Sequence, residues 1–231
     1  DADWNGTVPA ITYTLSDGEG GSDTADLVIT VDPVNDAPVA SGTIADQSDD
    51  DAGVVAGVAT SSFFSDIDGD VLGYSASGLP AGLSIDPVTG VISGTIDNSA
   101  SQGGPASDGV YSVTVTADDG NGGTVDQTFT WTVANPAPVA NDDAASTDED
   151  VAVRGNVIGS GGAGDVADSD ADGDVLSVTT FVVAGDPATY NAGDTATIAG
   201  VGTVLLASDG SYTFTPDADW NGTVPAITYT L

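Results

Sequence analysis

The sequence contains no cysteine, histidine, methionine or lysine, and Arg154 is its single basic side chain. The absence of cysteine excludes a disulfide scaffold, zinc–thiolate sites and thiol catalysis. Without histidine, lysine or cysteine a base-activated nucleophile is hard to assemble, so the sequence supports catalysis poorly. Paired carboxylates could serve a glycosidase, but here they lie in turn motifs that suit ions. We therefore expect that the chain is not an enzyme.

Acidic residues dominate what is present. The chain has 36 acidic residues and a formal net charge of −35, which argues against binding to nucleic acid or to anionic membranes. Its hydrophobic content of 40% is enough for a core, so the acidity does not indicate disorder. Two interpretations remain: a solvated acidic surface, or a polyanion that needs divalent cations to hold its shape. Clustering of the carboxylates, which repel one another, favours the second.

Apolar and hydroxylic side chains alternate with a period of two in several segments, clearest in residues 111–117 and 125–133. Such alternation indicates half-buried antiparallel strands. Asp-Gly and Asn-Gly turn signals recur between the segments, and no stretch has a convincing helical pattern. The predicted fold class is all-β, with tandem immunoglobulin-like (cadherin-like) Greek-key β-sandwiches.

Residues 1–15 return unchanged as residues 217–231, an offset of 216 residues (217 − 1 = 216). A repeat of this length indicates a window cut from a longer tandem array, in which each unit contacts mainly its neighbours. By this offset, residues 16–31 are the sequence that should follow Leu231 in the array.

Two proline-containing linkers, residues 32–40 and 134–142, divide the chain, because proline stiffens a joint and blocks strand continuation. We expect three parts. Residues 1–35 are the C-terminal part of a cadherin-like repeat plus its linker, residues 36–135 are a complete domain, and residues 136–231 are a repeat that lacks its last strand.

The segment Ser77–Thr95 resembles the GLPxGLSxDPxTGxISGT signature of Putative Ig and dystroglycan-type cadherin-like domains, a likeness that covers about residues 40–135. Residues 142–231, continued by 16–31, resemble the cadherin-like or VCBS tandem repeats of giant bacterial adhesins. The motifs that carry this second likeness are Thr147–Asp150, Asp168–Asp174, Gly210–Asp217, Trp220–Thr223 and Ser16–Gly21.

The resemblance implies an extender region of an RTX-type, type I-secreted adhesin on the surface of a Gram-negative bacterium. A chain without cysteine fits unfolded export and folding outside the cell. The expected localisation is therefore extracellular, at the cell surface, in the context of cell adhesion and biofilm.

Several acidic motifs predict Ca²⁺ as a cofactor. Ca²⁺ takes about 6–8 oxygen ligands at roughly 2.3–2.6 Å, and an extended Asp-x-Asp places two carboxylates on one face. The linker at residues 32–36 resembles the DxND joint of cadherins, which supplies carboxylate and carbonyl oxygens to Ca²⁺, and Glu149 matches an early cadherin glutamate. The candidate metal ligands are Asp17, Asp32, Asn35, Asp36, Asp66, Asp68, Asp70, Asp118, Asp119, Glu149, Asp170, Asp172 and Asp174.

Specific pairings follow for these acids. We expect Asp66 and Asp68 to pair with Asp118 or Asp119. We expect Asp170 and Asp172 to pair with the equivalent of Asp17, supplied by the chain's own N-terminal segment or by another molecule. The alternative is that the Asp-Gly clusters are ordinary β-turns with solvated aspartates. The pattern does not fit an EF-hand, because its glutamate at position twelve and its helices are missing. The second linker has Pro136 where the first has Asp36, which predicts fewer ions and a joint held by proline stiffness.

Three hypotheses for function remain open. The first is a structural extender, stiffened by Ca²⁺ between neighbouring repeats of the same chain. The second is a carbohydrate- or protein-binding module for a surface glycan, in which Trp4 and Trp220 stack on a sugar, although these side chains more often plug a sandwich end. The third is head-to-tail self-assembly, in which residues 1–31 complete the third domain of a neighbouring molecule by strand addition.

Overall fold

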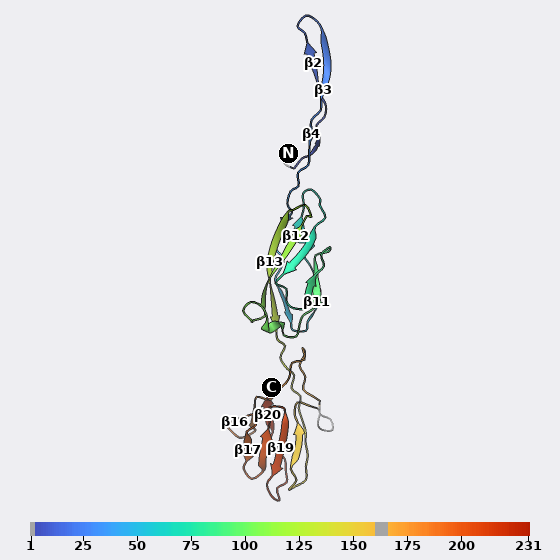
Figure 1. The fold of residues 1–231 in the computed structure, drawn as a ribbon. Coiled ribbons are helices and arrows are strands. Elements are labelled where there is room, and N and C mark those ends of the chain that lie inside the picture. The colour runs from blue at the N-terminus through green and yellow to red at the C-terminus, as the bar shows by residue number, and fades with distance from the viewer. Residues whose placement is uncertain (1–2, 160–165) are drawn as a thin grey trace. The chain divides into compact units, whose positions relative to one another are not determined.

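The computed structural model describes residues 3–159 and 166–231 (Figure 1). Over these ranges the chain forms twenty β-strands and two short 3-10 helices, η1 (Ser61–Phe63) and η2 (Ala100–Gln102), and no α-helix. The all-β prediction is therefore confirmed. Residues 1–2 and 160–165, which belong to the first and third predicted domains, lie outside the described residues. No helix in the described ranges has the length and apolarity needed to cross a membrane.

The chain divides into two compact units. The first contains residues 1–49, 53–96 and 102–132, and the second contains residues 50–52, 97–101 and 133–231.

The N-terminal part of the first unit is a two-stranded antiparallel ribbon (Figure 1). Strand β2 (Ile11–Ser16) pairs with β3 (Ser22–Leu27), and β1 (Gly6–Thr7) pairs with β4 (Thr30–Val31). A turn at residues 17–21 joins β2 to β3, and Asp17 N–H donates to the carbonyl oxygen of Gly21 at 3.1 Å. Every side chain of β2 and β3 is exposed, so the two strands pack on no core.

The middle of the chain forms two sheets and a short strand pair. The four-stranded sheet has the order β6-β13-β12-β9, the three-stranded sheet has the order β10-β11-β7, and β5 pairs with β8. The strands are β5 (Val39–Ala40), β6 (Gln47–Asp50), β7 (Val54–Ala59), β8 (Phe64–Ser65), β9 (Gly73–Ser77), β10 (Leu83–Ile85), β11 (Val91–Thr95), β12 (Val110–Asp118) and β13 (Thr124–Ala134).

The core of this sandwich follows the alternation in the sequence. Strand β12 buries every second side chain from Tyr111 to Ala117, and the hydroxylic residues between them stay exposed or half-buried. Trp131 on β13 is fully buried with its ring 6.0 Å from that of Phe129, and its indole N–H donates to Asp49 Oδ2 at 3.0 Å. A buried tryptophan usually needs a partner for its N–H, which Asp49 supplies.

The second unit also has two antiparallel sheets. Their strand orders are β14-β19-β18-β17 and β16-β15-β20. The strands are β14 (Val153–Asn156), β15 (Thr180–Val183), β16 (Thr189–Asn191), β17 (Thr195–Ile198), β18 (Gly202–Leu206), β19 (Ser211–Pro216) and β20 (Ile227–Thr230). Phe181 is 1% exposed and its ring stacks 5.2 Å from that of Tyr190. The other buried members of this core are Val157, Val178, Val183, Ala196, Val204, Leu206 and Phe214.

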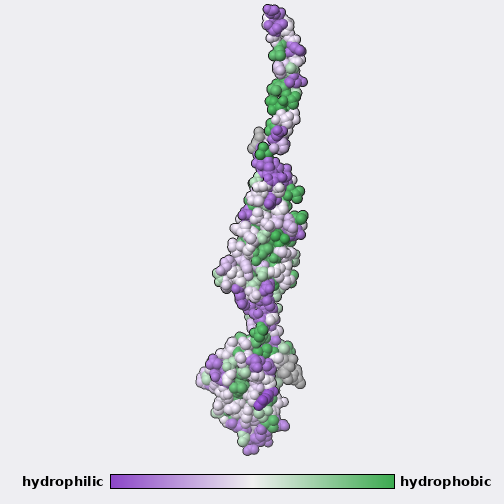
Figure 2. All heavy atoms as spheres, viewed as in Figure 1, coloured by the Kyte–Doolittle hydropathy of each residue, from purple (hydrophilic) through white to green (hydrophobic). Residues whose placement is uncertain are grey.

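Exposed apolar side chains are concentrated in the N-terminal ribbon, where Figure 2 shows hydrophobic residues on the surface. Ile11, Leu15, Leu27 and Val28 are all exposed there. Single exposed apolar residues are normal on a protein, but a group of them on one short segment marks a surface that can be covered.

Replacing Trp131 with alanine is expected to destabilise the protein by about 3–5 kcal/mol, because removal of a buried indole leaves a cavity. The change also leaves Asp49 without its donor. Urea unfolding followed by circular dichroism measures the effect. The control Val71→Ala removes a side chain that is 88% exposed, and should change the free energy of unfolding by less than about 0.5 kcal/mol. Equal effects of the two changes would contradict the assigned core.

Candidate metal centres

Within residues 3–159 and 166–231, two groups of carboxylates are close enough to share a cation, one in each compact unit. In each group three residues offer one oxygen apiece, and these oxygens lie within 4.8 Å of one another. The first acidic site consists of Asp66, Asp70 and Asp119, and the second consists of Asp170, Asp172 and Asp174. All of these donors are carboxylate oxygens, the ligand type that Ca²⁺ prefers.

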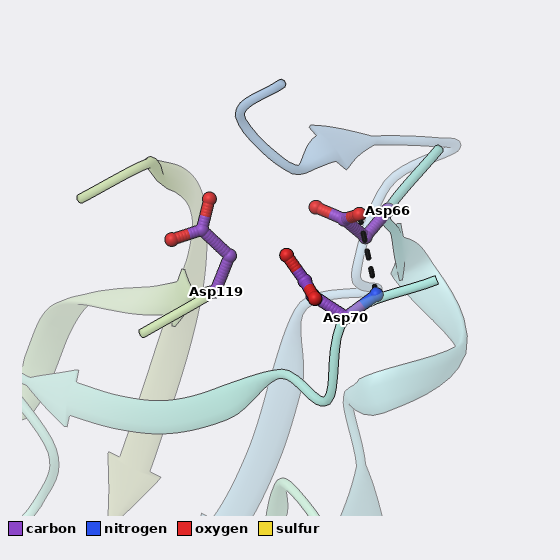
Figure 3. Close-up of side chains that lie close together, drawn as sticks. All are labelled: Asp66, Asp70 and Asp119. Atoms are coloured by element: carbon purple, nitrogen blue, oxygen red, sulfur yellow. Dashed lines mark hydrogen bonds between the residues drawn. The ribbon is translucent and has the colours of Figure 1, made fainter. Parts of the chain in front are cut away.

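In the first acidic site two of the carboxylates come from one loop (Figure 3). Asp66 and Asp70 follow β8, and Asp119 lies across from them on the turn between β12 and β13. Asp66 Oδ1 accepts the backbone N–H groups of Asp68 at 2.8 Å and Asp70 at 3.4 Å, which curls the loop. Asp66 Oδ2 is buried and has no hydrogen-bond partner. An oxygen buried in this way is costly unless a cation or a donor satisfies it.

The Asp119 turn is held by the same kind of hydrogen bond. Asp119 Oδ1 accepts the N–H groups of Asn121 at 2.7 Å and Gly123 at 2.9 Å. A Cβ at position 123 would clash with the Asp119 carboxylate, so the turn requires glycine there. The side-chain amide of Asn35 and these two N–H groups hold the pKa of Asp119 below its ordinary value. Asp119 is only 5% exposed, and the hydrogen bonds from Asn121 and Gly123 hold its carboxylate in one orientation at the site.

The first linker reaches this site directly. Asn35 Nδ2 donates to Asp119 Oδ2 at 3.0 Å, and Asp36 N–H donates to Asp68 Oδ2 at 2.7 Å. Burial, together with the charges of neighbouring aspartates, raises the pKa of Asp36. Asp68 lies outside the first acidic site, because its carboxylate is turned to the linker. Asp70 Oδ2 instead accepts the amide of Asn121 at 2.8 Å.

The second acidic site is formed by a single loop. Asp170 Oδ1 accepts the N–H groups of Asp172 at 3.1 Å and Asp174 at 3.3 Å, as Asp66 does in the first site. Asp172 is 8% exposed, and both of its carboxylate oxygens are buried without a donor. Proton sharing with Asp170, burial and the charges of Asp170 and Asp174 raise the pKa of Asp172 to about 6. Proton sharing and backbone N–H groups lower the pKa of Asp170.

Proline in the second linker explains why Asp172 lacks a donor. Val39 pairs with Ser65, and Val139 pairs with Ser169, so the two linkers approach their acidic loops in the same way. By this correspondence Asp172 stands where Asp68 stands, and Pro136 stands where Asp36 donates its N–H. Proline has no N–H, so Asp172 cannot be satisfied in the manner of Asp68.

The other candidate ligands are not members of the two acidic groups. Asp17 Oδ1 accepts the N–H groups of Glu19 and Gly21, each at 2.9 Å, which lowers the pKa of Asp17. Asp118 Oδ1 accepts Gly120 N–H at 2.7 Å, so this carboxylate closes its own turn. Asp32 is exposed in the linker, and Glu149 Oε2 accepts the amide of Asn221 at 3.5 Å.

A further acidic contact centres on Tyr229, a half-buried residue of β20. The Tyr229 hydroxyl lies 2.9 Å from Asp168 Oδ2 and 3.3 Å from Asp143 Oδ2. Burial, together with the hydrogen bond to Asp168, raises the pKa of Tyr229. Asp168 Oδ1 also accepts Asn141 N–H at 2.7 Å. These hydrogen bonds connect residues 141–143, at the end of the second linker, to β20.

Trp220 packs edge-on against Phe214, with ring centroids 6.3 Å apart, and is half-buried. Its identical counterpart Trp4 is exposed in the ribbon.

Two-sheet sandwiches with acidic loops beside a proline-containing linker define a chain of immunoglobulin-like and cadherin-like domains. Residues 37–134 match the family described as Putative Ig domain, and residues 135–231 match the family described as Bacterial cadherin-like domain. The chain therefore contains one region that matches each family. Domains of these families indicate an adhesion or extender module, are typically non-catalytic, and suggest an extracellular protein. No curated protein matches the chain.

Solved structures similar to the chain include several cadherin fragments. Human CDH23 EC21-23 is 16% identical with a TM-score of 0.41, over 90% of this chain and 64% of that chain. Drosophila N-cadherin EC1-4 is 15% identical with a TM-score of 0.38, over 87% and 46%. A putative alpha-galactosidase/melibiase from Bacteroides fragilis is 20% identical with a TM-score of 0.32, over 43% of this chain. The chain spans 19% and 21% of the two galactosidase chains that it matches.

The second acidic site predicts a pH effect in metal-free buffer. A carboxyl whose pKa is raised binds its proton more tightly in the folded state. Its stabilisation is therefore complete below the ordinary value of 3.8 and is lost as the pH rises through about 6. The melting temperature should fall from pH 4 to pH 7, and Asp172→Asn should remove that part of the fall. The control Asp217→Asn changes an exposed acid and should leave the profile unchanged. A wild-type slope in Asp172→Asn would contradict the assignment.

Proposed function

We propose that this chain is a non-catalytic extender segment of an extracellular adhesion protein, and that Ca²⁺ bound by the two acidic sites holds its loops and linkers in place. Asp66, Asp70 and Asp119 would hold one ion, and Asp170, Asp172 and Asp174 would hold another. Bound Ca²⁺ supplies positive charge to carboxylates that otherwise repel one another. Cadherin-like domains generally bind Ca²⁺, and the residues present fit that ion because every donor is a carboxylate oxygen.

The observation that carries the proposal is the Asp172 carboxylate. It is buried, neither oxygen has a donor, and two further carboxylates lie beside it. At neutral pH such a group must take up a proton or a cation. The chain offers only Arg154 as a cationic side chain, and this residue lies in β14. The charge that balances Asp172 therefore has to come from solution.

The position of the first acidic site beside the first linker supports a role in holding consecutive domains apart. Its residues Asp119 and Asp66 belong to one sandwich, and Asn35 and Asp36 of the linker contact the same turn and loop. An ion there would restrict the linker as well as the two loops. Restricting a linker reduces the number of directions that consecutive domains can take, which suits a module whose task is to hold distance. Secretion by a type I system and a place in an RTX-type adhesin belong to the same proposal.

Calcium should raise the melting temperature of the full chain, and a chelator should reverse the rise. One bound site at a free Ca²⁺ concentration of one hundred times Kd contributes about 2.7 kcal/mol. Asp66→Asn keeps the oxygen that accepts Asp68 N–H but alters the buried Oδ2, so it should reduce the Ca²⁺-induced rise. Scanning calorimetry with Ca²⁺, Mg²⁺ and EDTA provides the measurement.

Asp108→Asn is the matched control for this experiment. Asp108 is exposed and Asp108 Oδ1 accepts Val110 N–H at 3.1 Å, so the substitution keeps a turn hydrogen bond just as Asp66→Asn does. It should leave the response to Ca²⁺ intact. An unchanged transition of the wild-type chain in Ca²⁺ and in EDTA would overturn the proposed function.

A further inference from the structure

The chain contains three Asn-Gly dipeptides, at residues 5–6, 121–122 and 221–222. In such a dipeptide the backbone nitrogen of the glycine attacks the side-chain amide carbon of the asparagine, and its proton passes to water. The new C–N bond closes a cyclic imide, and the side-chain nitrogen leaves as ammonia. Water then reopens the ring at either carbonyl, which gives aspartate or isoaspartate. Glycine favours the attack because it has no Cβ to obstruct the approach and its backbone turns freely.

The surroundings of the glycine distinguish the three dipeptides. A Cβ placed on Gly6 or Gly222 would lie 3.5 or 3.2 Å from the ring of the tryptophan two residues earlier. A Cβ placed on Gly122 would meet nothing within 4 Å, and Asn121 and Gly122 are both exposed. The peptide at residue 122 therefore has room to turn toward the asparagine side chain, whereas an indole ring restricts the other two.

The side-chain amide of Asn121 lies beside the first acidic site. Asn121 Nδ2 donates to Asp70 Oδ2 at 2.8 Å, and Asp70 is one of the three carboxylates of that site. The neutral amide gives this carboxylate a donor without adding negative charge. An aspartate in its place would have no N–H to donate and would bring a fourth carboxylate to the other three. These groups repel one another unless a cation lies among them.

The ribbon shows that this kind of turn accepts a carboxylate at the same place. Residues 17–21 have the sequence Asp-Gly-Glu-Gly-Gly, and residues 119–123 have the sequence Asp-Gly-Asn-Gly-Gly. In both turns the first aspartate accepts the N–H groups two and four residues further on, so the backbone curls in the same way with Glu19 as with Asn121. The turn itself therefore does not require asparagine, and the distinctive contribution of Asn121 is the amide that contacts Asp70.

The two products of the reaction differ in their backbone. Aspartate keeps the length of the chain, so the N–H groups of residues 121 and 123 still reach Asp119 Oδ1. Isoaspartate adds a methylene group to the backbone between residues 121 and 122, which displaces Gly123 N–H from Asp119. Both products remove the donor from Asp70.

We propose that Asn121–Gly122 is a site of spontaneous modification, at which loss of ammonia turns the amide that contacts Asp70 into a fourth carboxylate of the first acidic site. The change destabilises the protein without a divalent cation and raises its affinity for Ca²⁺, because the affinity of a Ca²⁺ site rises with the charge of its ligands. The conversion stands on the surroundings of Gly122, whereas its effect on Ca²⁺ rests on the proposed function.

Ageing of the full chain tests the conversion. The protein is kept in mildly alkaline buffer with EDTA, and peptide mapping by mass spectrometry follows asparagine, aspartate and isoaspartate at the three dipeptides. Asn121 should convert several-fold faster than Asn221, whose glycine lies against an indole ring. Conversion of Asn221 at an equal or higher rate would overturn the assignment, and so would an Asn121 that stays intact.

Asn121→Asp reproduces the aspartate product without ageing. Its melting temperature in EDTA should be lower than that of the wild type, and saturating Ca²⁺ should remove the difference. In isothermal titration calorimetry one site should bind Ca²⁺ about tenfold more tightly. Asn121→Ala removes the donor without adding charge, so it should be less stable in EDTA but bind Ca²⁺ no more tightly than the wild type. Equal tightening in both variants would contradict the role of the added carboxylate.

Asn191→Asp is the matched control for the added charge. Asn191 is exposed, and Asn191 Nδ2 lies 3.4 Å from Asp194 Oδ2, so this substitution also replaces an amide donor by a carboxylate beside an aspartate. Asn191 is a member of neither acidic site, and the variant should bind Ca²⁺ as the wild type does. Equal affinities of Asn121→Asp and Asn191→Asp would overturn the effect assigned to residue 121.

The measurements separate a failure of this proposal from a failure of the proposed function. If Ca²⁺ does not raise the melting temperature of the wild-type chain, the proposed function fails and the effect on Ca²⁺ fails with it, while the peptide map still decides the conversion of Asn121. If Ca²⁺ stabilises the wild type and Asn121→Asp binds it no more tightly, the effect of the fourth carboxylate is wrong and the proposed function stands.

Discussion

The constraint on which the structure depends is that almost no basic side chain is present to form an ion pair with its carboxylates. With 36 acidic residues and one arginine, each buried or clustered carboxylate must be satisfied by a backbone N–H, a polar side chain, a proton or a cation. Four turns solve this in the same way: Asp17, Asp66, Asp119 and Asp170 each accept the N–H groups two and four residues further on. One oxygen, Oδ1, of the acid that begins each turn is thereby satisfied locally, whereas Oδ2 of Asp66 stays buried without a partner.

That local solution creates a second problem in two of the four turns. In the Asp-x-Asp-Gly-Asp loops the residues that supply the N–H groups are themselves aspartates, so the curl that satisfies Asp66 or Asp170 brings further carboxylates beside it. In the first loop Asp68 is turned away from the other carboxylates, and its Oδ2 accepts the N–H of Asp36. In the second loop Pro136 offers no N–H, and Asp172 stays buried without a donor. The proline that stiffens the linker therefore also increases the need for a proton or a cation.

Much of the fold could be predicted from the sequence, because the alternation in residues 111–117 and 125–133 reflects one buried and one exposed face. The acidic loops could be located too, since Asp-Gly turns between strands are recognisable. The sequence did not allow us to predict which carboxylates lie close together. Asp118 and Asp119 are neighbours in one turn, as Asp68 and Asp70 are in another, and they differ only in the direction of their side chains. Those directions depend on hydrogen bonds from Gly123 or Asp36, which are distant from the pattern itself. Domain boundaries and individual ligand roles stay predictions.

The repeated sequence shows how far local pattern determines burial. Tyr13 and Tyr229 have identical neighbours through residue 15 or 231, yet Tyr13 is exposed while Tyr229 is half-buried against Asp168. Alternation fixes which side chains share a face, and the surrounding sheets decide whether that face is covered. High like charge discourages unselective pairing of open edges, because two acidic chains repel until salt or a divalent ion screens them.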